Sequence, residues 1–199
     1  VKEAIVKKYN INPNKISVIN RGIDTNFFYK KTNQVFKDEL IKKLNLNTSK
    51  KIILFPARLT GWKGQLEFLD VVKKLDSNNF SFLFVGDTKN ETYTTSIKEK
   101  IIREKIGESC QILGNINSVE MKCLYEIADL SLSFPLRAEG FGRIISESLY
   151  ADTPVLAFNF GGVKNQLEGL NNIFKIEPFR YEIIHSRIEE LLKLEDSVK

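Results

Sequence analysis

The chain has 199 residues, of which 42% are hydrophobic and 28% charged, and its 30 Lys and Arg against 25 Asp and Glu give a net charge of +5. This composition is typical of a globular protein. The apolar runs end after five or six residues, far short of the roughly 20 that a membrane-spanning helix needs, so we exclude a transmembrane protein. The lysines are spread along the chain, singly or in pairs, and form no basic stripe with interleaved aromatic residues, so we expect no nucleic-acid partner.

The cysteine and histidine content argues against metal and redox sites. Cys110 and Cys123 have neither the CxxC spacing of a zinc or redox site nor the density of a secreted disulfide framework, so we expect buried thiols in a reducing compartment. His185 is the single histidine, and the sequence contains no Asp-x-Asp pair. We therefore expect no metal site and no cofactor.

The start of the chain suggests a fragment. Val1 lies within an amphipathic segment that runs to Tyr9, and we recognise no signal peptide or targeting segment. We interpret residues 1–199 as one excised domain of a cytoplasmic protein, either free or peripheral on the cytoplasmic face of the membrane.

Short β-rich runs alternate with longer helical patterns along the chain, and several runs are apolar at consecutive positions, as in strands buried on both faces. The expected strands are Ile16–Ile19, Lys51–Phe55, Phe80–Val85, Cys110–Leu113, Leu130–Phe134, Pro154–Phe158 and Ile173–Ile176. The expected helices are Gln34–Leu44, Gly64–Leu75, Tyr93–Ile106, Ser118–Ile127 (with Asn117 as its N-cap), Phe141–Ala151, Val163–Glu168 and Tyr181–Leu194. This alternation predicts an α/β fold with a parallel, Rossmann-like sheet covered by helices on both faces.

Ligands of such sheets bind at the carboxyl ends of the strands, where one expected loop carries two cations. Arg58 and Lys63 lie between the strand that ends at Phe55 and the helix that starts near Gly64. Two cations beside a helix N-terminus are unfavourable unless an anion binds with them, and a phosphate would meet that need. The other interpretation is a polar turn with two solvated surface cations.

A second loop, Glu139-Gly-Phe-Gly-Arg-Ile-Ile-Ser-Glu147, follows another buried strand. Gly140 and Gly142 leave backbone amides uncovered, so a diphosphate can approach a helix N-terminus closely. Glu139 and Glu147 would lie about 12 Å apart along a helix. Two carboxylates at that distance suit the hexose and the ribose at opposite ends of a nucleotide sugar. The other interpretation is that Glu147 is a solvated helix residue and the glycines only form a turn.

Two other uses of glycine-rich loops are disfavoured. Ile145 stands where a dinucleotide fingerprint would have its third glycine, and no Gly-Lys-Ser or Gly-Lys-Thr follows a glycine-rich loop. Nicotinamide binding and P-loop hydrolysis are therefore poor explanations of these loops.

Five ordered motifs together resemble the donor-binding C-terminal half of the retaining GT-B glycosyltransferases, above all the large family four, or glycosyl transferases group 1. They are Asn20-Arg-Gly-Ile-Asp-Thr-Asn-Phe-Phe28; Arg58 and Lys63 in Ala-Arg-Leu-x3-Lys-Gly; Tyr125-x2-Ala-Asp129; Glu139-x7-Glu147; and Asp152-Thr-Pro-Val-Leu-Ala157 with Gly161-Gly162. The resemblance implies a nucleotide-diphosphate sugar as donor, retention of anomeric configuration and no required metal. It further implies a glycan or lipid acceptor, as in surface polysaccharide or lipopolysaccharide synthesis, held by an N-terminal domain that this chain lacks.

The resemblance also assigns roles to residues. Arg58 and Lys63 match the family's diphosphate clamp and, with Glu139 on the donor hexose, form the expected catalytic group. Glu147 matches the ribose ligand. The remaining expected donor-binding residues are Gly22, Gly140, Phe141 and Gly142. Gly22 is equally compatible with an ordinary turn.

Some residues depart from the family's pattern. Arg143 stands where an aliphatic residue is frequent, Asp152 where a glycine is usual, and Asn165 where a glutamate is frequent. An epimerase of the same architecture and a non-catalytic nucleotide-binding module are the alternative functions. We consider the module less consistent with a set of four charges that would destabilise an empty site. As part of a glycosyltransferase, the isolated domain is expected to be inactive, because the acceptor would be bound by the N-terminal domain.

Overall fold

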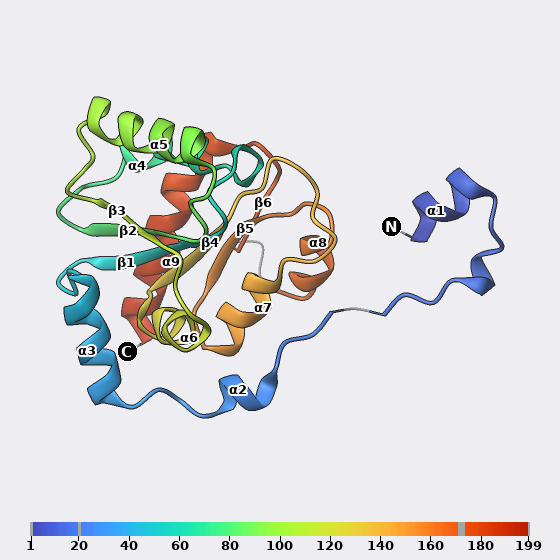
Figure 1. Ribbon diagram of the computed structural model, residues 1–199, viewed down its shortest axis with the longest axis horizontal. Coiled ribbons are helices and arrows are strands. Elements are labelled where there is room, and N and C mark those ends of the chain that lie inside the picture. The colour runs from blue at the N-terminus through green and yellow to red at the C-terminus, as the bar shows by residue number, and fades with distance from the viewer. Residues whose placement is uncertain (1, 20, 171–173, 199) are drawn as a thin grey trace.

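The computed structural model describes residues 2–19, 21–170 and 174–198, with the side chains up to Lys193. Its centre is one open, six-stranded sheet with the order β3-β2-β1-β4-β5-β6, in which every pairing is parallel (Figure 1). The strands are β1 (Lys51–Pro56), β2 (Phe80–Val85), β3 (Cys110–Gly114), β4 (Leu130–Ser133), β5 (Val155–Phe158) and β6 (Lys175–Ile176). The predicted α/β fold with a parallel Rossmann-like sheet is confirmed.

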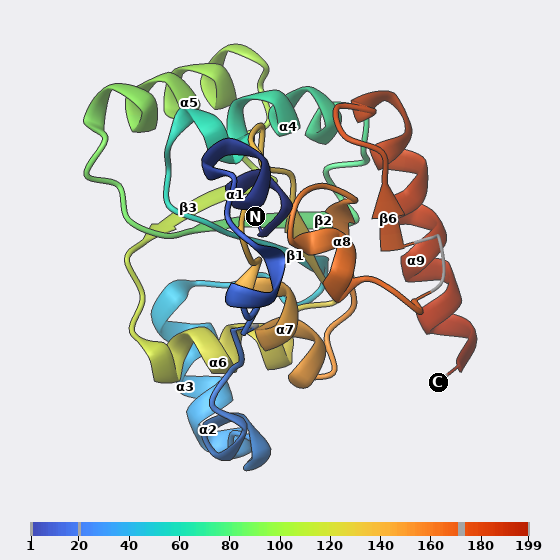
Figure 2. The same ribbon diagram turned by 90° about the vertical axis from the view of Figure 1, so that its right-hand side faces the viewer.

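Helices cover both faces of this sheet, as Figures 1 and 2 show. One face carries α4 (Gln65–Val72), α5 (Glu91–Arg103) and α9 (Ile184–Val198). The other carries α2 (Thr25–Tyr29), α3 (Gln34–Leu44) and α6 (Ser118–Ile127), with α7 (Arg143–Tyr150) and α8 (Val163–Gln166) over β5. The remaining elements are α1 (Lys2–Tyr9) and the short 3-10 helices η1 (Pro13–Lys15), η2 (Gly61–Lys63) and η4 (Tyr181–Ile183).

Alternate residues of the central strand enter two different cores. Ile53 and Phe55 of β1 pack toward α4, α5 and α9, whereas Ile52 and Leu54 pack toward α3 and α6. Successive side chains of a strand point to opposite faces, so a strand covered on both sides is apolar at every position. This double burial explains why the strands appear in the sequence as continuous apolar runs.

The observed elements differ from the expected ones in one strand and at several helix ends. The expected strand Ile16–Ile19 is wrong: the segment is extended but joins no sheet, and Val18 and Ile19 are 65% and 90% exposed. A strand is stabilised by pairing and burial, and these β-branched residues find neither here. The helix expected over Phe141–Ala151 begins at Arg143. Ile173, the first residue of the last expected strand, lies outside the described residues.

The N-terminal segment lies beside the sheet domain. In Figure 1, α1 is set apart from the sheet, and none of its residues is buried. Among the helices that the structure describes, none is long and apolar enough to cross a membrane.

Candidate donor-binding site

The loops that follow β1 and β4 meet at the carboxyl edge of the sheet. The chain moves outward from β1 to β3 and then returns to β4 on the other side of β1, so the strand order reverses between these two neighbours. Ligands of open α/β sheets bind in the crevice at such a reversal. The backbone amide of Leu136 in the second loop donates to the carbonyl oxygen of Trp62 in the first, at 2.7 Å. The two loops are therefore in direct contact.

Close backbone approach requires glycine at the start of α4. Gly64 is the N-cap residue of α4 and has a φ of 82°. A Cβ built on it would lie 2.2 Å from the carbonyl oxygen of Phe134, which no side chain could tolerate. Glycine alone allows this left-handed turn and this contact. The Lys-Gly pair in the sequence thus marks the point where the first loop touches the second.

The first loop presents its two cations differently. The ammonium of Lys63 forms an ion pair with the carboxylate of Glu139 and lies 4.2 Å from the centre of the Trp62 ring. Arg58 is exposed, and its guanidinium has no hydrogen-bond or ion-pair partner among the described residues. The anion that we expected beside Lys63 is thus supplied within the chain by Glu139.

The loop after β4 rests on the loop after β5. The backbone amide of Gly162 donates to the carbonyl oxygen of Glu139 at 2.7 Å. A Cβ on Gly162 would lie 2.1 Å from the carbonyl oxygen of Gly140, whereas a Cβ on Gly140 itself would meet nothing within 4 Å. Gly162 therefore allows the two loops to approach, and Gly140 lies on an open side. Phe141 and Gly142 complete this loop, and Gly142 is the N-cap of α7 without a side-chain cap.

Because α7 begins at Arg143, a continuous helical rise, from which we derived a separation of about 12 Å, does not connect Glu139 with Glu147. Glu139 lies in the loop and faces Lys63, while Glu147 lies one turn into α7. The two carboxylates still belong to different parts of the site, but the loop and not a helical rise separates them.

Glu147 is held by two side chains on opposite sides. Its Oε2 accepts from the hydroxyl of Tyr125 at 3.0 Å, and its Oε1 accepts from Nε of Arg143 at 2.8 Å. The Glu147 side chain is 14% exposed, so it is not the solvated helix residue of the other interpretation. Burial, and after it the neighbouring Glu147 charge, raises the pKa of Tyr125 well above its ordinary value. Tyr125 therefore remains a hydrogen-bond donor to Glu147 throughout the physiological range.

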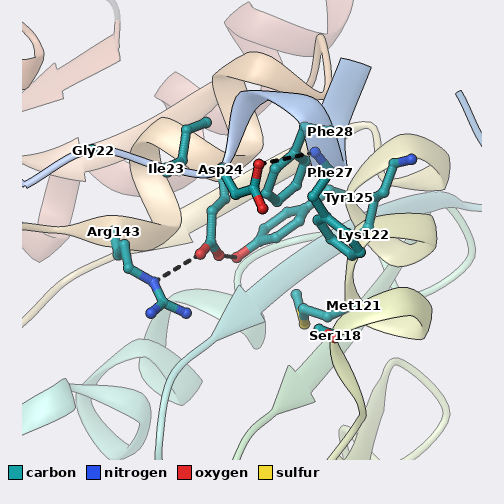
Figure 3. A pocket seen from close by; sticks show the side chains of 11 residues that line it. Gly22, Ile23, Asp24, Phe27, Phe28, Ser118, Met121, Lys122, Tyr125 and Arg143 are labelled. Carbon is teal, nitrogen blue, oxygen red and sulfur yellow. Dashed lines mark hydrogen bonds and ion pairs between the residues drawn. The ribbon is translucent and has the colours of Figure 1, made fainter. Parts of the chain in front are cut away.

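Glu147 forms part of the wall of a cavity of about 250 Å³ (Figure 3). The cavity is lined by Gly22, Ile23, Asp24, Phe27, Phe28, Ser118, Met121, Lys122, Tyr125, Arg143 and Glu147. Asp24 caps α2 by accepting from the amide of Phe27 at 3.2 Å, which brings the segment around Gly22 over α6 and α7. Gly22 and Glu147 thus line the same cavity, whereas Lys63 and Glu139 are not among its lining residues.

Several cavity residues were missed by sequence reasoning. Phe27, Phe28 and Met121 supply an apolar wall, and Lys122 a basic edge. The helical spacing of Met121 and Tyr125, four residues apart on α6, was the signal that could have placed them on one face with the motif Tyr125-x2-Ala-Asp129.

The described residues form no metal-binding cluster, and neither cysteine lines this cavity. Over residues 2–19, 21–170 and 174–198, no group of three or more His, Cys, Asp and Glu side chains could hold a metal ion. Cys110 and Cys123 are free thiols, half-buried and buried respectively. Burial raises the pKa of Cys110 to about 12 and is the main cause that raises the pKa of Cys123 to about 11.

Comparisons with known proteins agree with the fold and the motifs. The family model described as "Glycosyl transferases group 1" matches residues 36–199. A solved glycosyltransferase of Rickettsia africae superposes with a TM-score of 0.90 at 31% identity, over 97% of this chain and 51% of that one. HepE of Anabaena, solved in complex with UDP and glucose, superposes with a TM-score of 0.84 at 22% identity, over 98% of this chain and 52% of that one.

Curated relatives give the same picture. The lipopolysaccharide 1,2-N-acetylglucosaminetransferase of Salmonella typhimurium is 28% identical over 163 residues, which are 78% of this chain and 43% of that protein. The chain spans less than half the length of the first curated relatives it matches, between 40% and 44%. Because the family model matches residues 36–199, which are most of this chain, the chain belongs to the glycosyl transferases group 1 family.

Proposed function

We propose that this chain is the donor-binding domain of a retaining glycosyltransferase that transfers a sugar from a nucleotide-diphosphate sugar to a glycan or lipid acceptor. The observation that carries the proposal is the pairing of Lys63 with Glu139 between the loops after β1 and β4, where the strand order reverses, with Glu147 of the following helix at a cavity. Each of these side chains is largely buried and yet ends at the edge of the sheet where ligands of this fold bind.

In the proposed reaction, Lys63 and Arg58 bind the diphosphate. Negative charge grows on this leaving group as the bond to the sugar breaks, and preorganised cations stabilise that charge in the transition state. A phosphate oxygen would take the place of Glu139 as the partner of Lys63. Glu139, released from Lys63, would accept hydrogen bonds from hydroxyl groups of the hexose, and the open backbone around Gly140, Phe141 and Gly142 would let the diphosphate approach.

Glu147 is proposed to bind the ribose. A carboxylate that already accepts from Tyr125 has free lone pairs for ribose hydroxyls, because each oxygen can accept more than one hydrogen bond. The cavity beside Glu147 would hold the part of the ligand that continues from the ribose toward Gly22 and α6. No metal is part of the proposal, since Lys63 and Arg58 supply the positive charge that faces the diphosphate.

Two comparisons support a nucleotide sugar as donor and a glycan as acceptor. HepE of Anabaena, which shares the fold, was solved with UDP and glucose, and the Salmonella relative is a lipopolysaccharide sugar transferase. Because the chain spans less than half the length of such relatives, we propose that the acceptor is bound by a further, N-terminal domain of a longer cytoplasmic or membrane-surface protein.

The test is calorimetric binding of UDP, GDP and ADP to the chain and to Glu147→Gln, at fixed pH and salt. We expect saturable binding of at least one nucleotide, weakened about ten- to a hundredfold by Glu147→Gln, because a charge-assisted hydrogen bond contributes about 1.5–3 kcal/mol. Glu108→Gln, which changes an exposed glutamate before β3, is the matched control and should bind normally. Absence of saturable binding to all three nucleotides would overturn the proposal, as would multiple turnover of sugar transfer by this chain alone.

A further inference from the structure

A buried amide side chain lies directly behind the loop that carries Arg58 and Lys63. Gln65, the first residue of α4, is fully buried, which is unusual for glutamine. Its Nε2 donates to the backbone carbonyl oxygen of Arg58 at 3.0 Å, and its Oε1 accepts from the hydroxyl of Tyr93 at 3.2 Å. One side chain thus joins the loop after β1 to the neighbouring helix α5.

Tyr93 performs a second task at the same place. Its hydroxyl oxygen accepts from the backbone amide of Leu66 in the first turn of α4, at 3.2 Å. Gly64 occupies the N-cap position and has no side chain that could accept from this turn. The contact of Gly64 with Phe134 excludes any larger residue there. The cap is therefore supplied from another helix, by Tyr93 of α5.

The ring of Tyr93 also lies near Gly61, in the middle of the same loop. A Cβ built on Gly61 would lie 3.8 Å from the ring of Tyr93. Tyr93 is half-buried, and desolvation is the main cause that raises its pKa, so the hydroxyl stays protonated and can donate to Gln65. Hydrogen bonds thus hold the backbone at Arg58 and at Leu66, and the ring of Tyr93 lies near Gly61 between them.

We infer that Gln65 and Tyr93 are positioning residues that fix the loop at 57–64 and thereby set where Arg58 and Lys63 meet a diphosphate. Neither side chain contacts the guanidinium of Arg58 or the ammonium of Lys63, so both act through the backbone. The part of the inference that concerns loop order stands on these contacts alone. Its consequence for diphosphate binding rests on the proposed function.

The effect on binding follows from geometry. A cation contributes fully to phosphate binding only when it is held in place before the ligand arrives, and small displacements of a binding group lower affinity. Loss of either hydrogen bond would also leave a buried partner unsatisfied, which the loop can relieve only by moving. We therefore expect loop order and diphosphate affinity to change together.

The experiment uses Trp62, the single tryptophan of the chain, as a reporter inside the loop. Gln65→Met and Tyr93→Phe keep the side-chain size and remove the hydrogen bonds. We expect each to raise the acrylamide quenching constant of Trp62 about twofold and to speed amide exchange over residues 58–63. Tyr181→Phe is the matched control, because the buried Tyr181 hydroxyl lies 3.3 Å from a Cβ built on Gly64 and has no hydrogen-bond partner among the described residues. It should leave both readouts unchanged.

The second readout compares UDP with UMP. A displaced clamp should weaken UDP about three- to tenfold and leave UMP almost unchanged, whereas a general loss of stability would weaken both ligands alike. The double variant should lose less UDP affinity than the product of the two single effects, since both residues act through one chain of bonds.

Unchanged Trp62 quenching in Gln65→Met and Tyr93→Phe would overturn the inference, as would equal changes in Tyr181→Phe. If quenching rises in the two variants but the unmodified chain binds neither UDP nor UMP, the proposed function fails while the positioning of the loop stands. If the unmodified chain binds UDP and both variants bind it equally well, the inference fails and the proposed function stands.

Discussion

The ammonium of Lys63 and the carboxylate of Glu139 form an ion pair between two loops, across 76 residues of sequence. Their side chains are only 18% and 15% exposed, so the pair is shielded from solvent. A phosphate that binds Lys63 must therefore compete with a carboxylate already in place. In the unliganded site Glu139 thus neutralises Lys63, whereas Arg58 has no ion-pair partner among the described residues, and the expected destabilisation of the empty site stays a prediction.

This competition predicts the effect of Glu139→Gln. The amide removes the negative charge that competes for Lys63, so UDP should bind about three- to tenfold more tightly, as expected for an ion pair that contributes about 1 kcal/mol. Calorimetry at fixed salt measures it, with Glu168→Gln, at an exposed position, as the control. Weaker UDP binding to Glu139→Gln would show that Glu139 is not a competitor of the diphosphate.

The two partners of Glu147 should contribute unequally to stability. Tyr125 is buried, and Tyr125→Phe should lower the free energy of unfolding by about 1–2 kcal/mol, because it leaves Oε2 of the half-buried Glu147 without its donor. Arg143 is 64% exposed, and Arg143→Ala should change stability by less than about 0.5 kcal/mol. Urea unfolding compares them, with Tyr150→Phe as the tyrosine control. A larger loss for Arg143→Ala than for Tyr125→Phe would contradict the assignment.

Two neighbouring glycines should respond oppositely to alanine. Gly162→Ala places a methyl group 2.1 Å from the carbonyl oxygen of Gly140, so it should destabilise the chain by about 2 kcal/mol or more. Gly140→Ala meets nothing within 4 Å and should leave stability nearly unchanged. If the open side at Gly140 receives the diphosphate, Gly140→Ala should still weaken UDP binding. Thermal unfolding and calorimetry separate the two effects, and equal destabilisation by both substitutions would refute the prediction.

The buried thiols make stability fall at alkaline pH. Burial raises the pKa of Cys110 from 9.0 to about 12 in the folded chain, so the unfolded chain loses this proton first as the pH rises. The stabilising contribution is complete below the unfolded pKa and is lost between pH 9 and pH 12. From pH 8 to pH 10 we expect a loss of about 1.4 kcal/mol from Cys110, by the linkage relation.

Urea unfolding of the chain and of Cys110→Ala at both pH values isolates this contribution from that of tyrosines with raised pKa values. The Cys110→Ala variant should show the smaller fall. At pH 8, a thiol reagent should label neither cysteine in the folded chain and both in denaturant. Rapid labelling of Cys110 in the folded chain would show that the thiol is accessible.

The sheet could be predicted from the sequence because four of its strands, β1, β2, β4 and β5, are buried on both faces. The runs Ile52–Phe55 and Phe82–Val85 are apolar at consecutive positions because helices cover both faces of the sheet, and this pattern distinguishes them from surface segments. Asn117 also marked the start of α6 correctly, and its side chain accepts from the amides of Val119 and Glu120. The run Ile16–Ile19 has the same composition but no partner strand, which local sequence cannot reveal.

The site was less predictable, because its contacts join distant parts of the chain. The roles of Arg58, Lys63, Glu139 and Glu147 stay predictions, but their grouping at one edge of the sheet followed from the loop positions. The pairing of Lys63 with Glu139 and the support of the loop by Gln65 and Tyr93 depend on side-chain geometry between elements. Asp152, unusual in its motif, has a φ of 67°, which explains why a glycine is common there and why aspartate is tolerated.

The strand order also divides the proposed site between two halves of the chain. Lys63 follows β1, within the half that forms β1, β2 and β3, whereas Glu139 and Glu147 belong to the half that forms β4, β5 and β6. A cut at residues 115–117 would place the cations and the carboxylates on separate polypeptides. A nucleoside diphosphate that binds only the paired halves would draw them together by mass action. The domain is thereby suited to a split sensor, in which fragment association reports the ligand, and fragments that associate equally well without nucleotide would show that the site does not span the β1–β4 junction.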